Sequence, residues 1–175
     1  VADVRNRQNI EIARHVRGQR QHGEGRAPVG LHDCAAAAIA HTQGRAAQRG
    51  VALVLSGQGH SGPWEAELIT LAIGNLLDNA CTYSPPHSPV TARVSLHARQ
   101  WCLQVRNAVG SAGAPDPEQV FRKYHRAEEA KGLAGAGLGL WLGHNLAQRL
   151  GGTLSVQTVN DHVEFKLCLP LTTPP

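Results

Sequence analysis

The stretch Gly135-Ala136-Gly137-Leu138-Gly139-Leu140 opens an amphipathic run that ends at Gly151-Gly152. Glycines at alternate positions let the backbone approach a ligand closely and leave its N–H groups unblocked. A helix from about 138 to 150 would then turn its positive N-terminal end toward an anion. A glycine run alone can also be a simple hinge. The apolar positions that follow, with Leu146 on the core side, favour an ordered junction and therefore a phosphate-binding loop.

A second motif, Asn75-Leu76-Leu77-Asp78-Asn79-Ala80, lies upstream in a mostly apolar segment. Asn75 and Asn79 are four positions apart, so both side chains project from one face of a helix. A buried amide without a partner costs roughly 1–3 kcal/mol. A hydrated magnesium ion bound to phosphate oxygens would satisfy both amides. The alternative is a hydrogen-bonded contact between this helix and a loop, with no ligand.

Composition limits the class of protein. The chain has 175 residues, 42% hydrophobic and 17% charged, which suits one globular domain with some terminal material. No apolar run is long enough to span a membrane and no secretion signal opens the chain, so we expect no membrane contact by this chain. The lack of Met suggests a fragment of a longer protein. The net charge of +4 comes with arginines that lack interleaved aromatic residues, so we expect no nucleic-acid partner.

The four cysteines are scattered and form no C-x-x-C pair. This pattern predicts free thiols in a reducing cytoplasm. His32 and Cys34 are the nearest approach to a metal-ligand pair, and two ligands are too few for a transition-metal site.

The hydrophobic pattern predicts an α+β fold with helices on one face of a mixed, mostly antiparallel sheet. Residues 1–29 are predicted to be a linker or the remnant of a helix, and residues 30–172 one domain. We expect helices at 31–48, 64–81, 115–124 and 138–150, strands at 51–55, 90–98, 101–105, 153–159 and 162–169, and a mobile segment at 127–136. Asn160-Asp161 is expected to turn the last hairpin, and Arg99-Gln100 the one before it.

Together these motifs resemble the catalytic ATP-binding domain of two-component sensor histidine kinases. Asn75–Pro85 resembles its N box, Phe121–Arg126 its F box, Gly135–Leu140 its second glycine box, and Phe165–Pro170 its closing strand. The superfamily also includes gyrase and the heat-shock and mismatch-repair ATPases. The resemblance implies a two-layer α/β sandwich of the Bergerat type, with a lid from about 110 to 136 over ATP.

The resemblance also assigns roles to residues of this chain. Asn79 would coordinate magnesium and Asn75 would support the phosphates, so both count as catalytic. Tyr83 would lie near the nucleotide and Arg126 would neutralise phosphate charge. The second glycine box would hold the triphosphate through Gly135, Gly137, Leu138 and Gly139. Relatives that hydrolyse ATP have a glutamate where this chain has Asn75, and an amide cannot act as a general base. Phosphoryl transfer is therefore favoured over hydrolysis.

Two positions depart from the family pattern near the base and the phosphates. The first glycine box usually reads D-x-G-x-G, and the run here is Asn107-Ala108-Val109-Gly110-Ser111. Asn107 can still accept a hydrogen bond from the adenine amino group, but without the charge that strengthens it. Thr82 stands where a basic residue is usual. Both changes are expected to weaken ATP binding.

The phosphoacceptor histidine of the family lies on an upstream helical hairpin. His32-Asp33 fits its local pattern only superficially, because the expected helix 31–48 and strand 51–55 already fill the space before Asn75. His15 lacks an acidic neighbour. We therefore expect the acceptor hairpin to lie outside this chain.

The resemblance implies partners as well: the acceptor hairpin of the parent kinase and the receiver domain of a response regulator. The parent is expected to be a homodimer and the domain to be cytoplasmic, and an anchor of the parent in the inner membrane stays open. Two alternatives stay open: a degenerate ATP-binding module that only docks other proteins, and a serine kinase of the anti-sigma-factor type.

Overall fold

The computed structural model describes residues 28–59, 61–97, 99–124 and 137–171. Within these ranges the chain forms three helices and seven strands. The helices are α2 (Leu31–Gln48), α3 (Ala66–Tyr83) and α4 (Gly139–Arg149). The strands are β1 (Val29–Gly30), β2 (Leu53–Gly57), β3 (Ser61–Gly62), β4 (Val90–His97), β5 (Gln100–Ala108), β6 (Thr153–Val159) and β7 (His162–Pro170).

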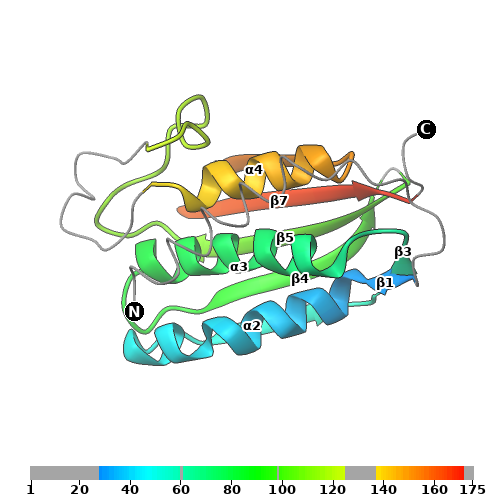
Figure 1. Cartoon of the computed structure of the whole chain (residues 1–175). Helices are drawn as coiled ribbons and strands as arrows, with labels where there is room; N and C mark the ends of the chain where they lie inside the picture. The colour runs from blue at the N-terminus through cyan, green and yellow to red at the C-terminus, as the bar shows by residue number, and fades with distance from the viewer. Residues whose placement is uncertain (1–27, 60, 98, 125–136, 172–175) are drawn as a thin grey trace.

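The main sheet has five strands in the order β2-β4-β5-β7-β6. β2 runs parallel to β4, and the other neighbours are antiparallel. All three helices lie on one face of this sheet, with α3 between α2 and α4 (Figure 1). The structure therefore confirms the predicted two-layer α/β sandwich with a mixed, mostly antiparallel sheet. A small antiparallel pair, β1 with β3, was not predicted.

The central position of α3 explains its apolar sequence. Ten of its residues are buried, on more than one side of the helix, because α2, α4 and the sheet all contact it. α2 is buried along a narrower stripe that includes Leu31, Ala35, Ala38 and Thr42. Gly50, with a φ of 63°, ends α2 as the sequence suggested.

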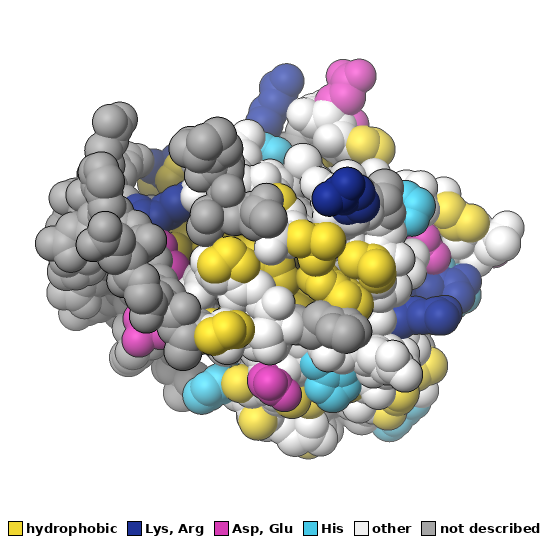
Figure 2. Space-filling model, turned by 90° about the vertical axis from the view of Figure 1, so that its right-hand side faces the viewer, with side chains coloured by type: hydrophobic (Ala, Val, Ile, Leu, Met, Phe, Trp, Pro, Cys, Tyr) yellow, Lys and Arg dark blue, Asp and Glu magenta, His cyan; other side chains and the backbone are white. Residues whose placement is uncertain are grey.

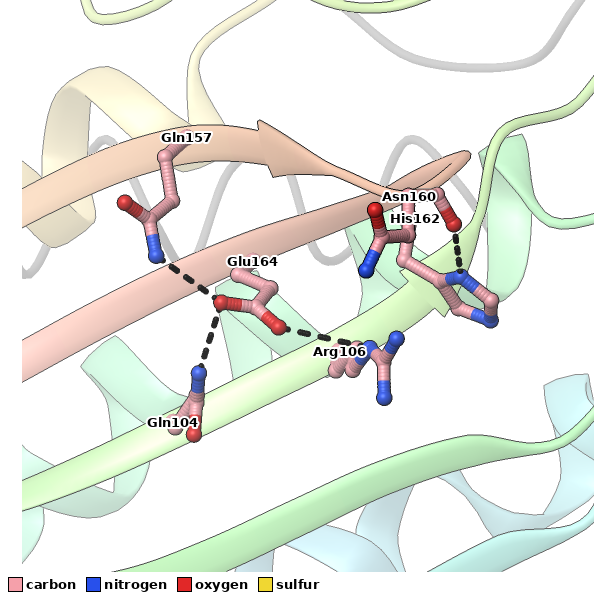
Figure 3. Close-up of polar contacts among 6 residues, drawn as sticks. All are labelled: Gln104, Arg106, Gln157, Asn160, His162 and Glu164. Atoms are coloured by element: carbon pink, nitrogen blue, oxygen red, sulfur yellow. Dashed lines mark hydrogen bonds and ion pairs between the residues drawn. The ribbon is translucent and has the colours of Figure 1, made fainter.

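Alternation along the strands separates the two faces of the sheet. Val105 and Phe165 pair across β5 and β7, are fully buried, and belong to the core under the helices. On the opposite face, Glu164 accepts hydrogen bonds from Gln104 (2.8 Å) and Gln157 (2.9 Å) and lies 3.3 Å from Arg106 Nε (Figure 3). One carboxylate thus ties together the three strands β5, β7 and β6.

The last hairpin turns where the sequence predicted. Asn160 and Asp161 have φ values of 47° and 57°, as a two-residue turn of the primed type requires. In the preceding hairpin Gln100 pairs with His97 and is the first residue of β5, so β5 begins one residue earlier than expected.

The predicted helix at 115–124 is wrong. This segment forms consecutive turns: the Asp116 carboxylate accepts from the Glu118 N–H (2.9 Å), and the Asp116 carbonyl accepts from the Val120 N–H (2.9 Å). The turn is not continued, and Tyr124 has a φ of 62°, which no right-handed helix contains. The predicted linker or helix in residues 1–29 lies almost wholly outside the described residues, as does the segment 127–136.

The prediction of free thiols is wrong for two of the four cysteines. Cys102 and Cys168 form a disulfide between β5 and β7. The antiparallel register places these residues directly opposite each other, which their spacing in the sequence does not reveal. Cys34 and Cys81 are free and buried.

The two ends of the sandwich differ. Hydrophobic side chains gather in the middle of the end near β1 and β3 (Figure 2). Leu96 near the end of β4 and Leu171 just after β7 are 56% and 37% exposed. At the opposite end, α3 finishes and α4 begins (Figure 1).

Within the described ranges, no helix is both long and apolar enough to cross a membrane.

Candidate functional site

The two sequence motifs meet where α3 faces the start of α4. Gly139, the first residue of α4, lies against Asn75: a Cβ on Gly139 would be 3.3 Å from Asn75 Oδ1. Asn75 is only 8% exposed. The absence of a side chain at Gly139 therefore lets the start of α4 approach the amide of α3 closely.

The amide nitrogen of Asn75 is buried and has no hydrogen-bond partner among the described residues. A buried N–H donor without a partner is costly, so such a group usually faces a ligand or water. The alternative to a ligand, a hydrogen bond from this amide nitrogen to a loop, is not formed within the described residues.

The start of α4 has a backbone conformation and free N–H groups that suit an anion. Gly137 has a φ of 66°, a value that L side chains rarely adopt, and Leu138 precedes the first helical residue with its side chain 9% exposed. No side chain of the described residues caps this helix. The first N–H groups of a helix lack intrahelical acceptors and carry partial positive charge. An oxyanion such as a phosphate could satisfy them.

Asn79 and Tyr83 continue along α3 from Asn75, each one turn further, and both are half-buried. The chain after β5 passes close to the end of this helix, because a Cβ on Gly110 would overlap the Tyr83 carbonyl oxygen. The segment that includes Asn107 is thereby brought to the same end of the sandwich as the two motifs.

Asn107 is 2% exposed and lies near the end of β5. Its Nδ2 donates to the Ala108 carbonyl (2.8 Å), and its buried Oδ1 has no partner among the described residues. The Ala108 carbonyl fixes the orientation of the amide, since the flipped orientation would set two oxygens against each other. The group that Asn107 can offer a ligand is therefore an acceptor.

Position 82, where the resembling family usually has a basic residue, is a threonine in this chain. The Thr82 hydroxyl donates to the Asp78 carbonyl in its own helix (2.7 Å). Asp78 lies 3.7 Å from Arg45 Nε of α2. This ion pair ties α2 to α3.

The cysteine nearest to these residues is Cys81, in α3. Burial, with a further contribution from the negative charge of Asp78, raises the pKa of its thiol to about 11. Burial also raises the pKa of the Cys34 thiol. Both thiols are protonated at neutral pH, so neither is a candidate nucleophile.

The amide side chains of α3 are the donors at this site that a metal ion bound to a nucleotide could use. Among the described residues, no group of three or more His, Cys, Asp or Glu side chains could hold a metal ion. Amide oxygens from α3, together with phosphate oxygens and water, are ligands that magnesium accepts. Asn79 is the residue that could supply such an oxygen.

The structure thus brings most of the predicted site residues to one end of the sandwich: Asn75, Asn79, Tyr83, Asn107, Gly137, Leu138 and Gly139. Arg126 and Gly135 lie outside the described residues. No sequence motif indicated that His144 of α4 contacts Phe121. The F-box resemblance marked Phe121, but only the fold reveals its partner.

The chain is similar to known proteins. The family described as histidine kinase-, DNA gyrase B-, and HSP90-like ATPase matches residues 65–173, more than half of the chain. Sensor histidine kinase HprS of Escherichia coli (strain K12) is 30% identical over 103 residues, which cover 59% of this chain and 23% of HprS. Adaptive-response sensory kinase SasA of Gloeothece citriformis (strain PCC 7424) is 33% identical over 110 residues, which cover 61% of this chain and 28% of SasA. The chain thus spans about a quarter of these relatives.

The fold recurs in solved structures. The mycobacterial sensor histidine kinase MprB superposes with a TM-score of 0.72 at 20% identity, covering 85% of this chain and all of that one. The sandwich architecture is therefore that of histidine kinase catalytic domains, and the family match includes α3, the chain around Asn107 and the start of α4. This chain belongs to the family of histidine kinase-, DNA gyrase B- and HSP90-like ATPases.

Proposed function

We propose that this domain binds Mg-ATP and transfers the γ-phosphoryl group to a histidine on a helical hairpin outside this chain. The observation that carries the proposal is the contact between Asn75 and Gly139: the start of α4, which no side chain of the described residues caps, lies against Asn75 Oδ1, and Nδ2 of the same amide is buried without a hydrogen-bond partner among those residues. Donors of both kinds suit phosphate oxygens. Sensor kinases among the relatives support the same assignment.

Each residue has a distinct role in the proposal. Asn107 Oδ1 accepts from the amino group of the base, and Tyr83 lies beside the nucleotide. The N–H groups at Gly137–Gly139 and the Asn75 amide bind phosphate oxygens. Asn79 holds the magnesium ion, which neutralises phosphate charge when it is bound. Arg126 and Gly135 would add contacts from outside the described residues.

The neutral amide at position 75 favours phosphoryl transfer over hydrolysis of ATP. A general base must accept a proton from water, and an amide does not do so at neutral pH. Asn75 is also surrounded by the apolar core residues of α3. The site therefore positions phosphate and balances its charge, and the nucleophile must come from the acceptor protein.

The partners in this proposal are the acceptor hairpin and a response-regulator receiver domain, in a homodimeric parent protein. We place the domain on the cytoplasmic side because ATP is available there, although a reducing cytoplasm disfavours the Cys102–Cys168 disulfide. A non-catalytic docking module is the second candidate, because both Asn107 and Thr82 lack the charge usual at their positions.

Calorimetric titration of Mg-ATP into this domain tests the proposal. Binding is expected at micromolar to millimolar affinity, weakened at least about tenfold in Asn79→Ala and tightened in Asn107→Asp, whose carboxylate strengthens the hydrogen bond to the base. If neither the wild type nor Asn107→Asp gives any heat, the proposal is wrong and the non-catalytic docking module is the remaining candidate.

Once binding is established, a reaction of labelled ATP with the parent protein identifies the phosphoacceptor. An acid-labile phosphohistidine supports the proposal, and an acid-stable phosphoserine on a partner indicates the serine-kinase alternative.

A further inference from the structure

Phe121 lies between the surface of α4 and the core. Its ring stacks on His144 with centroids 5.0 Å apart and an interplanar angle of 22°. It also meets Phe165 of β7 edge to face, at 6.4 Å and 75°. Phe165 is fully buried. Two rings of different elements therefore hold the turn segment 116–124 at Phe121.

A second contact joins the same segment to α4. Lys123 Nζ lies 5.3 Å from the ring centroid of Trp141 and 5.0 Å from that of Tyr124. Trp141 and His144 are three positions apart on α4, so they share one face of the helix. The turn segment consequently lies along that face, held by one aromatic stack and one cation–π contact.

This segment leads directly to the glycine loop. The Tyr124 N–H donates to the Gly137 carbonyl (3.0 Å), so the described chain before residue 125 is hydrogen-bonded to the described chain after residue 136. Gly137 is two residues before Gly139, which touches Asn75. A continuous series of contacts thus runs from His144 through Phe121 and Tyr124 to the loop at the candidate phosphate site.

We propose that His144 is a positioning residue for this glycine loop, acting through the flat face of its ring on Phe121. The two ring nitrogens make a single polar contact within the described residues. Nδ1 is buried without a hydrogen-bond partner there, and Nε2 lies 3.1 Å from the Gln148 amide nitrogen. An aromatic ring of similar size should replace it. As a statement about nucleotide binding, the inference rests on the proposed function, but the anchoring itself does not.

Amide hydrogen exchange without nucleotide tests the anchoring alone. His144→Ala is expected to speed exchange in residues 116–124, including the Tyr124 amide, about three- to tenfold. His144→Phe keeps the stack and should exchange like the wild type. Asn145→Ala, on the exposed side of the same helix, is the matched control and should change nothing in this segment. Unchanged exchange in β5 and β7 would establish that the fold is intact.

Mg-ATP titration then tests the effect on the site. The affinity should fall about three- to tenfold in His144→Ala and recover in His144→Phe. Wild-type exchange rates in His144→Ala would overturn the anchoring, and so would a Phe variant that exchanges as fast as the Ala variant. Faster exchange with unchanged ATP affinity would overturn the positioning role. A wild type that binds no ATP would contradict the proposed function, while the exchange result would still decide the anchoring.

Discussion

Gly139 and Asn75 touch across the interface between α4 and α3, with only 3.3 Å between the place of a Gly139 Cβ and Asn75 Oδ1. Asn75 is held in the central helix, whose apolar neighbours leave it little room to shift. The close approach brings the N–H groups at the start of α4 and the Asn75 amide to one place. A side chain at position 139 would therefore contact the Asn75 amide, at the candidate ligand site, rather than the apolar core.

Gly139→Ala should separate stability from nucleotide binding. Alanine favours a helix over glycine by about 1 kcal/mol, which offsets the strain of moving the Asn75 amide, so thermal stability should change little. The added methyl group must displace the Asn75 amide by a few tenths of an ångström, and we expect Mg-ATP affinity to fall at least about tenfold. Calorimetric titration and a thermal melt measure the two effects.

Gly143→Ala is the matched control on the same helix. A Cβ there would meet Leu154 Cδ2 at 3.6 Å, an ordinary packing distance away from the Asn75 contact. It should stabilise the fold and leave ATP affinity unchanged. Equal loss of affinity in both variants would mean that the Gly139–Asn75 contact is not what matters.

The sequence correctly predicted those helices and turns that depend on residues close together in the chain. The helix expected at 31–48 has those bounds because an alanine-rich run meets a glycine stop, and Asn160-Asp161 turns the last hairpin because both residues tolerate positive φ. The asparagine spacing predicted one helix face, and Asn75 is indeed buried on it. Such features depend on residues within a few positions of each other.

What the sequence missed depends on contacts between distant segments. Residues 115–124 have helix-start signals, yet Phe121 packs against α4 and β7 and the turns are not extended into a helix. Cys102 and Cys168 become partners only when β5 pairs with β7. The orientation of the Asn107 amide depends on the Ala108 carbonyl, a backbone detail that no motif records. The candidate site residues come from the sequence, whereas only the structure shows which of their buried atoms have no hydrogen-bond partner among the described residues.

Replacing Glu164 should weaken the sheet without touching the ligand site. Its side chain is 12% exposed and accepts from two glutamines, whereas its ion-pair partner Arg106 is 41% exposed and contributes less because solvent screens it. Glu164→Ala should lower the unfolding free energy by about 1–2 kcal/mol in urea denaturation. Gln157→Ala, which removes one donor, should cost less. Changed ATP affinity in Glu164→Ala would show that the two faces of the sheet are coupled.

The disulfide predicts a definite thiol count. Protein prepared without reductant and unfolded in urea should react at two thiols, those of Cys34 and Cys81, and at all four cysteines after reduction. The bridge spans a sequence separation of 66, so its loss should lower the unfolding free energy by up to about 4 kcal/mol. The double variant Cys102→Ala/Cys168→Ala should not respond to reductant. Four reactive thiols in the unreduced protein would contradict the disulfide.

Cys81 should make the fold sensitive to alkali. Its pKa is raised from 9.0 to about 11 in the folded protein, chiefly by burial and then by the charge of Asp78, so the folded state disfavours the thiolate that the unfolded chain forms freely. The contribution of this group to stability is complete below the unfolded pKa and is lost as pH rises from there through the folded pKa. Urea denaturation at about pH 8 and about pH 10.5 should therefore show a larger loss in the wild type than in Cys81→Ala. Because Cys34 and other groups that titrate in this range are present in both proteins, the difference isolates Cys81. Equal losses would mean that the Cys81 thiolate is tolerated in the folded protein.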